Sequence, residues 1–249
     1  MELTNKVVLV TGGAQGLGKA ICESFLERKN KVCIADVNND KGLKTVENLN
    51  SRFGAGSAIY TSCDVSKESD FQDLFERTIS IFGRVDILVN NAGIGGENNW
   101  RKVVEVDLMG VISGTKLAFK FMGTENGGVG GAVVNIASTA GLVPVPLGPI
   151  YCACKHGVVS YTRSVGTELH YTKSGVTVSA ICPSFIDTEM TRQMENLSIF
   201  QQETKKFKES LQLMEPSYVA EAVIYLLETK KINGAVLKVT KEGGYQYVL

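Results

Sequence analysis

The chain has 249 residues, of which 44% are hydrophobic and 21% charged, the balance of a globular protein that buries a substantial core. Its 26 basic and 26 acidic side chains cancel to a formal net charge of +0 at pH 7, so no overall positive field attracts nucleic acid or anionic lipid. Residues 1–6 lack the pattern of a secretion signal, and no apolar stretch reaches the roughly 20 residues that span a bilayer. We therefore expect a soluble, cytoplasmic protein that binds neither nucleic acid nor membranes.

Short apolar runs alternate with segments of helical periodicity. In chain order, the pattern predicts a strand at residues 6–11, a helix at 16–29, a strand at 31–35, a helix at 40–53, a strand at 57–62, a helix at 69–82, a strand at 86–89, a helix at 103–122, a strand at 132–137, a helix at 151–171 and a strand at 176–182. This alternation predicts parallel strands joined by right-handed helical crossovers, with helices covering both faces of the sheet. No linker divides the chain, so we expect one doubly wound α/β domain over residues 1–249.

Residues 184–215 are more polar and less periodic than the rest of the chain. Ligands bind beyond the carboxyl ends of parallel strands, and this segment leaves such an end. We therefore expect a substrate lid, and a solvated helix–loop excursion is the alternative.

The six cysteines lie mostly in apolar periodic segments, where a free thiol acts as a small hydrophobic side chain. Cys152 and Cys154 are too closely spaced for a zinc site, and no second pair of Cys or His complements them. We expect reduced structural thiols and no bound metal.

A glycine-rich turn, TGGAQGLG at residues 11–18, lies between the first predicted strand and the first predicted helix. Gly12 allows a tight turn, Gly16 lets the backbone approach a pyrophosphate, and Gly18 lets the helix pack on the sheet. The helix N-terminus then offers free N–H groups to phosphates. A purely structural glycine turn is the alternative, but this context predicts a Rossmann fold that binds a dinucleotide.

Asp36 follows the second strand, 18 residues after Gly18. A carboxylate there accepts hydrogen bonds from the adenosine ribose and repels the 2′-phosphate of NADP. Gln15 offers no cation that would pair with that phosphate. Both features favour NAD, and the alternative is a helix cap or a solvent-facing carboxylate.

Two further strand ends carry candidate cofactor residues. Asp64 follows the third strand and either reaches the adenine or caps the next helix, a role for which Ser66 competes. The sequence NNAG at residues 90–93 follows the fourth strand, where small residues let the backbone pass under the ribose; read alone, it is an ordinary turn.

Ser138 follows the fifth strand, and Tyr151 and Lys155 lie 13 and 17 residues further on, on one face of the next helix. An unperturbed tyrosine titrates near ~10 and is a poor base at neutral pH, but a nearby cation favours the phenolate. Tyr151 would then remove the proton of an alcohol while hydride moves to the cofactor. Ser138 would hold the substrate oxygen, and Lys155 would also hold the nicotinamide ribose.

Other chemically active residues receive a structural interpretation. His156 points off the face of Lys155, and neither it nor His170 accompanies a Ser or Cys nucleophile, so a catalytic histidine is disfavoured. Trp100 is expected to be a packing residue or part of the substrate wall.

The motifs TGGAQGLG, Asp36, CDV at 63–65, NNAG, Ser138, YCACK at 151–155 and CPSFIDT at 182–188 resemble the short-chain dehydrogenase/reductase family over nearly the whole chain. Within that family, the motifs DILVNNAG, NNW, VISGT, YCACKHG and INGAVLKVT are most similar to the NAD-linked 15-hydroxyprostaglandin dehydrogenases and their insect alcohol-dehydrogenase-like relatives. The resemblance implies about seven parallel strands and a homodimer or homotetramer packed through the two long helices.

The resemblance also implies which residues meet the cofactor and the substrate. The implied cofactor contacts are Gly12, Gln15, Gly16, Leu17, Gly18, Asp36, Val37, Cys63, Asp64, Val65, Asn91, Ala92, Gly93, Tyr151, Lys155, Pro183, Ile186 and Thr188. Ile186 and Thr188 would reach the nicotinamide carboxamide. Ser138, Gly148 and Tyr151 would contact the substrate.

Three positions depart from the family pattern. An asparagine that completes a proton relay to the lysine is replaced by Asp107, which we count among the catalytic residues because its backbone carbonyl remains. Pro-Gly is replaced by Pro183-Ser184 at the lid hinge. The prostaglandin dehydrogenases carry a glutamine where this chain has Gly148, which weakens the case for prostaglandin as the substrate.

The sequence therefore predicts an NAD-dependent oxidoreductase that interconverts an apolar alcohol (a lipid, terpenoid or steroid alcohol) and its ketone or aldehyde. Apolar residues near 95–100, 142–150 and 184–214 are expected to line the pocket. The alternatives are a physiological carbonyl reductase and a non-catalytic NAD-binding regulator.

Overall fold

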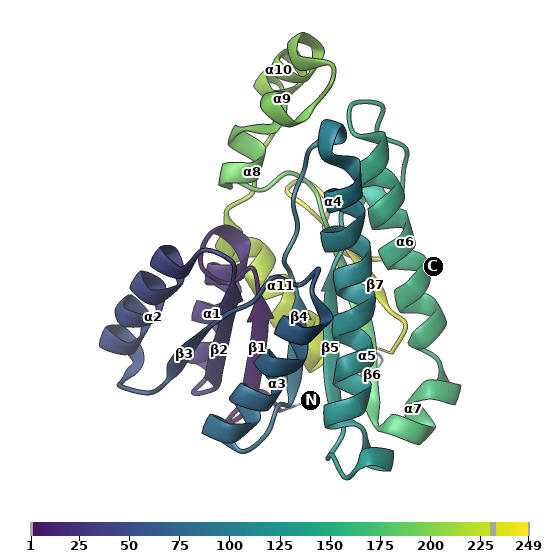
Figure 1. Ribbon diagram of the computed structural model, residues 1–249. Coiled ribbons are helices and arrows are strands. Elements are labelled where there is room, and N and C mark those ends of the chain that lie inside the picture. Colours follow the sequence, from purple (N-terminus) through teal and green to yellow (C-terminus); the bar gives the residue numbers. More distant parts are fainter. Residues whose placement is uncertain (1, 230–232, 249) are drawn as a thin grey trace.

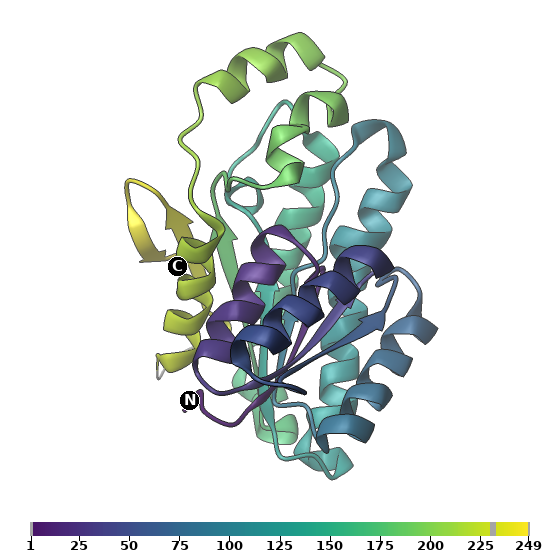
Figure 2. The ribbon, with the colours of Figure 1, turned by 90° about the vertical axis from the view of Figure 1, so that its left-hand side faces the viewer.

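The computed structural model describes residues 2–229 and 233–248, which form one sheet with helices on both faces (Figure 1, Figure 2). The strands are β1 (Val7–Thr11), β2 (Lys31–Asp36), β3 (Ala58–Ser62), β4 (Ile87–Asn90), β5 (Gly131–Ile136), β6 (Val176–Pro183), β7 (Val236–Thr240) and β8 (Gly244–Tyr247). Their order is β3-β2-β1-β4-β5-β6-β7-β8, and the first seven are parallel. This confirms the predicted doubly wound α/β fold, to which β8 adds an antiparallel edge strand.

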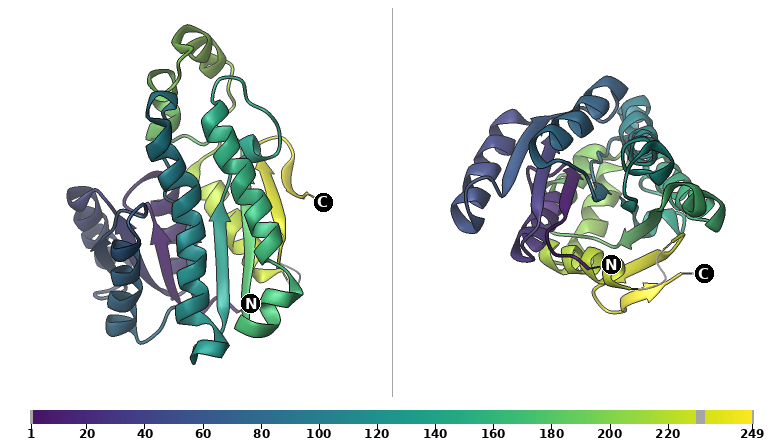
Figure 3. Two further views of the ribbon diagram at one scale, coloured as in Figure 1. Left: turned by 45° about the vertical axis from the view of Figure 1, so that its right-hand side comes forward. Right: turned by 90° about the horizontal axis from the view of Figure 1, so that it is seen from below.

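Two helical layers enclose the sheet, as the view from below shows (Figure 3). The helices are α1 (Gly16–Glu27), α2 (Asn39–Phe53), α3 (Glu68–Phe82), α4 (Trp100–Val104), α5 (Gly110–Met122), α6 (Pro149–Val165), α7 (Glu168–Ser174), α8 (Glu189–Arg192), α9 (Met194–Leu197), α10 (Gln201–Glu209) and α11 (Pro216–Glu228). Val8 and Val10 pack with α1, α2 and α11, whereas Leu9 between them packs with α3 and α5. This alternation explains why the central strands are apolar at every position.

The predicted helix at 103–122 is interrupted in the structure. Helix α4 begins earlier, at Trp100, and one π-helical turn, Glu105–Met109, separates it from α5. Such a turn widens the helix by one residue and occurs frequently at functional sites.

The predicted helix at 151–171 is also divided, into α6 and α7. The break falls at Gly166, where a Cβ atom would collide with the backbone of Gly234. The close approach of two chain segments therefore ends α6, although the apolar periodicity continues beyond it.

Residues 184–215 form an excursion that carries α8, α9 and α10 and lies above the carboxyl edge of the sheet (Figure 1). Its two ends are joined, because Ile186 and Met214 form an isolated parallel bridge and the Met214 amide donates to the Phe185 carbonyl at 2.9 Å. The excursion therefore leaves and rejoins the domain at one point.

The sequence pattern predicted no individual element beyond residue 215, where the structure has α11, β7 and β8. Ile232, the first residue of the INGAVLKVT motif, lies outside the described residues. All six cysteines are buried and unpaired, as expected. Within the described ranges, no helix has the length and apolar character needed to cross a membrane.

Candidate active site

The glycine-rich turn joins β1 to α1 in a conformation that its glycines make possible. Gly12 and Gly16 have φ angles of 63° and 53°, a region that L side chains rarely adopt. A Cβ at Gly18 would meet the carbonyl oxygen of Gly12 and would lie 2.6 Å from Nδ2 of the Asn91 side chain. Gln15 precedes α1 in an extended conformation and makes no side-chain cap, so the first turn of α1 keeps N–H groups available for an anion.

Thr11 and Asn91 hold this turn against the end of β4. The Asn91 side chain donates to the carbonyls of Thr11 and Gly12 at 2.9 and 3.1 Å. The Thr11 hydroxyl accepts from the backbone amides of Asn91 and Ala92, each at 3.0 Å. Asn91 thus supports the loop directly, and its contact with the cofactor stays a prediction. Thr11 is a supporting residue that the sequence analysis missed.

Asp36 ends β2 beside the glycine turn. Its Oδ2 accepts from the Ala14 amide at 3.1 Å, and its Oδ1 accepts from the Asn38 amide at 3.0 Å. The carboxylate therefore faces the loop, as a ribose-binding role requires. The neighbouring Val37 is largely exposed.

The residues after β3 divide between the core and the surface. Cys63 and Val65 are buried in the core. The Asp64 carboxylate accepts from the Ser66 hydroxyl at 2.7 Å and forms an ion pair with Lys102 at 3.1 Å, which ties it to α4. Neither of the caps considered from the sequence is formed, because Lys67 precedes α3 and makes no side-chain cap.

Ser138, Tyr151 and Lys155 come together at the carboxyl end of β5. The Ser138 hydroxyl accepts from the Ala140 amide at 3.1 Å and so fixes the turn after the strand. The buried Lys155 ammonium donates to the Ile136 carbonyl at 3.2 Å and lies 5.3 Å from the centroid of the Tyr151 ring. The Ser138 hydroxyl is a hydrogen-bonding neighbour of the Tyr151 phenol, so the three groups predicted for acid–base chemistry form one cluster.

Asp107 lies in the π-helical turn and is fully buried. One carboxylate oxygen is 3.2 Å from the Lys155 nitrogen, and the other accepts from the Ile94 amide at 2.8 Å. Burial raises the pKa of the Asp107 carboxyl above its usual range, and the Lys155 ammonium opposes that change. Burial by itself would lower the pKa of Lys155, but the Asp107 carboxylate and Tyr151 raise it overall.

The pKa of the Tyr151 phenol is raised above its ordinary value. Burial is the main cause; the Lys155 ammonium lowers the pKa, the Asp107 carboxylate raises it, and the Ser138 hydroxyl lowers it. In the protein alone, therefore, the aspartate offsets part of the activation that the lysine provides.

Glu97 caps the helix that carries Tyr151, and the sequence analysis did not identify it. Its carboxylate accepts from the Ile150 amide at 3.1 Å and from the Tyr151 amide at 3.4 Å. Gly148, at the N-cap position of α6, has no side chain to serve these amides. A Cβ at Gly148 would lie 3.7 Å from a Glu97 oxygen, so the glutamate stands beside the predicted substrate position.

The excursion at 184–215 closes over this edge of the sheet. Ile186 is buried, and the Thr188 hydroxyl accepts from the Thr191 amide at the start of α8. A Cβ at Gly95 would lie 2.8 Å from the Leu197 side chain, and the Ser198 hydroxyl donates to the Leu147 carbonyl at 3.1 Å. The excursion therefore touches both segments expected to wall the substrate pocket.

The remaining candidates lie apart from the cluster. His156 contacts the Cys152 carbonyl at 2.9 Å, His170 stacks on Phe119, and Trp100 is partly exposed beneath Arg101. A surface groove over α6 is lined by residues such as Leu142, His156 and Arg163 and does not include Ser138, Tyr151 or Lys155, so it is separate from the cluster. Among the described residues, no three His, Cys, Asp or Glu side chains are grouped to hold a metal ion.

Comparison with known proteins agrees with this geometry. A family model described as short chain dehydrogenase matches residues 6–197. The NAD(+)-dependent 15-hydroxyprostaglandin dehydrogenase of Rattus norvegicus is 39% identical over 99% of this chain and 95% of its own length. Zerumbone synthase of Zingiber zerumbet is 34% identical over 98% of this chain and 96% of its own length.

Two solved structures have closely similar folds. A short-chain dehydrogenase/reductase from Burkholderia phymatum in complex with NAD superposes with a TM-score of 0.82 at 25% identity, covering 96% of this chain and 90% of that one. Levodione reductase superposes with a TM-score of 0.82 at 29% identity, covering 95% of this chain and 96% of that one.

Proposed function

Because the chain belongs to the short-chain dehydrogenase family, we propose that it is an NAD-dependent oxidoreductase that interconverts an alcohol and its carbonyl compound, with Tyr151 as acid and base. The observation that carries this proposal is the cluster of Ser138, Tyr151 and Lys155 at the sheet edge where the glycine turn ends β1. The reaction requires a dinucleotide site and a positioned proton acceptor; the glycine turn would provide the first and the cluster the second.

The glycine turn and Asp36 fit NAD. Three features of the turn suit a pyrophosphate. Gly12 and Gly16 have positive φ angles, Gly18 leaves no space for a side chain, and the start of α1 is uncapped. The Asp36 carboxylate would hold the adenosine ribose. Bound NAD supplies the acceptor for the hydride that leaves the alcohol carbon.

The chain's own residues handle the proton. In alcohol oxidation, the Tyr151 phenolate oxygen accepts the hydroxyl proton while Ser138 holds the substrate oxygen by a hydrogen bond. The Lys155 ammonium stabilises the phenolate, and the Asp107 carboxylate holds the ammonium in place. In carbonyl reduction, the same phenol returns the proton to the substrate oxygen.

The substrate we infer is a small apolar alcohol or ketone. The excursion at 184–215 supports this class because Phe185 packs edge-on against Phe207 at 5.5 Å, and Leu197 closes on the wall at Gly95. We propose that this excursion is the lid of a single functional domain spanning residues 1–249. Prostaglandin itself is disfavoured because Gly148 offers no side-chain group to a substrate hydroxyl.

We also infer a homodimer or homotetramer in the cytoplasm. What supports assembly is the family resemblance, which implies packing through the long helices α5 and α6.

The test is absorbance at the NADH band with purified protein, NAD or NADP, and a panel of apolar secondary alcohols. We expect NADH formation with one class of alcohol, and near-complete loss of turnover in Tyr151→Phe while NADH still binds. Tyr161→Phe, on the same helix but outside the cluster, is the matched control and should keep wild-type activity. Full activity in Tyr151→Phe would refute the mechanism, and NAD binding without turnover in wild type and in Asp107→Asn would favour the regulator.

A further inference from the structure

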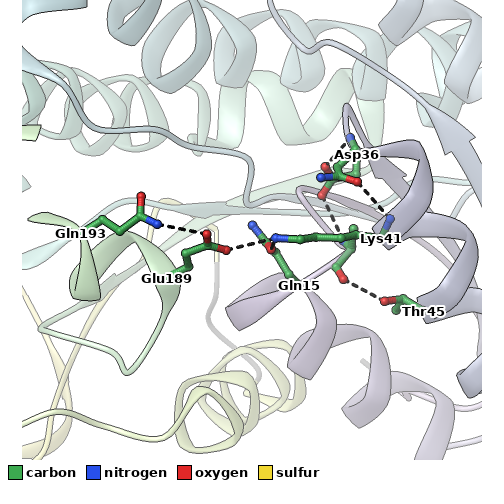
Figure 4. Close-up of polar contacts among 8 residues, drawn as sticks. Gln15, Asp36, Lys41, Thr45, Glu189 and Gln193 are labelled. Carbon is green, nitrogen blue, oxygen red and sulfur yellow. Dashed lines mark hydrogen bonds and ion pairs between the residues drawn. The ribbon is translucent and has the colours of Figure 1, made fainter. Parts of the chain in front are cut away.

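Lys41 joins three segments that surround the adenosine end of the cofactor site. It lies in the first turn of α2, and its ammonium donates to the Gln15 side-chain oxygen at 2.5 Å and to the Glu189 carboxylate at 3.1 Å (Figure 4). Gln15 belongs to the glycine turn, and Glu189 is the first residue of α8 in the lid. A cation thus stands beside Gln15, where the sequence alone showed none.

A chain of hydrogen bonds connects Lys41 to the ribose carboxylate. The Asn38 amide donates to Asp36 at 3.0 Å, and the Asn38 side chain accepts from the Lys41 amide at 3.0 Å. The side chain of Lys41 then extends from α2 toward Gln15 (Figure 4). The ammonium itself lies between the glycine turn, which would take the pyrophosphate, and the first residue of α8. The backbone of the same lysine is linked through Asn38 to the carboxylate that would take the adenosine ribose, the sugar to which NADP adds its 2′-phosphate.

The present partners of the ammonium are weak competitors for such a phosphate. Lys41 and Glu189 are 46% and 51% exposed at the side chain, and exposed ion pairs contribute little. Gln15 is neutral. A 2′-phosphate carries nearly two negative charges and forms charge-assisted hydrogen bonds with an ammonium.

We propose that Lys41 is a cofactor-specificity residue whose ammonium is positioned to bind a 2′-phosphate, that the Asp36 carboxylate prevents this in the NAD-selective protein, and that Glu189 competes only weakly for the ammonium. The proposal rests on the proposed function, since it requires a dinucleotide at the glycine turn. It follows that removing the Asp36 charge alone admits NADP, with no cation introduced. Asp40, in the same turn of α2, is a further exposed carboxylate that stays constant in the comparisons below.

The experiment measures binding of NADH and NADPH by fluorescence titration, so no alcohol substrate is needed. The variants are Asp36→Asn, Asp36→Asn with Lys41→Ala, and Asp36→Asn with Lys44→Ala. Lys44 is an exposed lysine one turn further along α2 and provides the same change of charge. Asp36→Ala provides a second background if the asparagine variant folds poorly, and thermal unfolding checks each protein.

We expect Asp36→Asn to bind NADPH more tightly than wild type does. Adding Lys41→Ala should weaken NADPH binding about tenfold and change NADH binding less than about twofold, because only NADPH carries the 2′-phosphate. Adding Lys44→Ala should change neither by more than about twofold. Glu189→Gln in the Asp36→Asn background should strengthen NADPH binding, because it removes the competing carboxylate.

Equal NADPH dissociation constants with and without Lys41, in protein that binds NADH normally, would overturn the role of Lys41 and leave the proposed function intact. An equal loss of NADPH affinity on replacing Lys44 would also overturn it, because the loss would then come from the net charge of α2 and not from the position of Lys41. Wild-type protein that bound neither dinucleotide would overturn both proposals.

Discussion

The Asp107 carboxylate and the Lys155 ammonium lie 3.2 Å apart, and both side chains are shielded from solvent. A buried carboxylate beside the lysine changes the electrostatics of Tyr151, the proposed acid and base, because it opposes the effect of the lysine on the phenol. Asp107 is thus a positioning residue for Lys155, and its charge also acts directly on Tyr151.

Asp107→Asn should move the rising limb of the pH profile for alcohol oxidation to lower pH. The sign follows because oxidation needs the phenolate, and removing a carboxylate that raises the pKa of Tyr151 lets that pKa fall. The measurement is kcat/KM against pH. Glu105→Gln, an exposed change of equal charge in the same turn, should leave the profile in place. An unmoved limb in active Asp107→Asn would contradict the coupling.

Glu97→Ala should destabilise the protein by about 1 kcal/mol, because it removes the acceptor for two amides at the start of α6. It should also lower kcat more than it changes the affinity for NADH, since those amides precede and include Tyr151. Glu97→Gln keeps an acceptor and should recover most of the stability. Chemical denaturation and steady-state kinetics measure both effects. Asn98→Ala, next in the chain and exposed, is the control; the same losses there would show that the cap is not their cause.

Gly18→Ala should weaken NADH binding and lower the free energy of unfolding by about 1–3 kcal/mol. The added methyl group would meet the Gly12 carbonyl and the Asn91 amide, which hold the cofactor loop. Fluorescence titration and denaturant unfolding provide the measurements. Lys19→Ala, at the adjoining surface position, should change stability by less than about 0.5 kcal/mol. Normal binding by Gly18→Ala would mean that the loop has room which the structure does not show.

The six thiols should resist modification in the native protein. Burial raises the pKa of Cys63 and of Cys182 to about 12, and it raises those of Cys22, Cys33 and Cys154 as well. At these five positions thiolate, the reactive form, is therefore scarce at pH 8, and the sixth thiol, Cys152, is buried. A colorimetric thiol reagent should react slowly until denaturant is added and then report all six cysteines. Rapid labelling of folded protein would reveal an opening that exposes the core.

The cofactor loop and the cluster of Ser138, Tyr151 and Lys155 were predictable because each feature sits within a few residues of a strand end. Parallel strands bring such ends to one edge of the sheet, so local patterns were sufficient. Asp36 followed from the same rule.

Glu97 and Lys41 could not be predicted in this way. Glu97 reaches α6 across 53 residues of chain, and Lys41 meets Glu189 across 148. Both contacts depend on how loops and the excursion at 184–215 pack, which periodicity does not encode. The π-helical turn at Glu105–Met109 was missed for a related reason, because one extra residue barely alters an apolar pattern over a single turn.

That turn makes the segment sensitive to length. An α-helix rotates by about 100° for each residue, so deleting one residue from the turn would rotate α4 against α5 by about that angle. Lys102, on one side of the turn, pairs with Asp64, while Asp107, within it, pairs with Lys155. In a shortened helix, keeping one of these two ion pairs would rotate the residues of the other pair apart. Substitutions at the exposed positions of this turn, Glu105 and Met109, should therefore cost less than a single deletion, so the number of residues in the turn is more constrained than its exposed side chains.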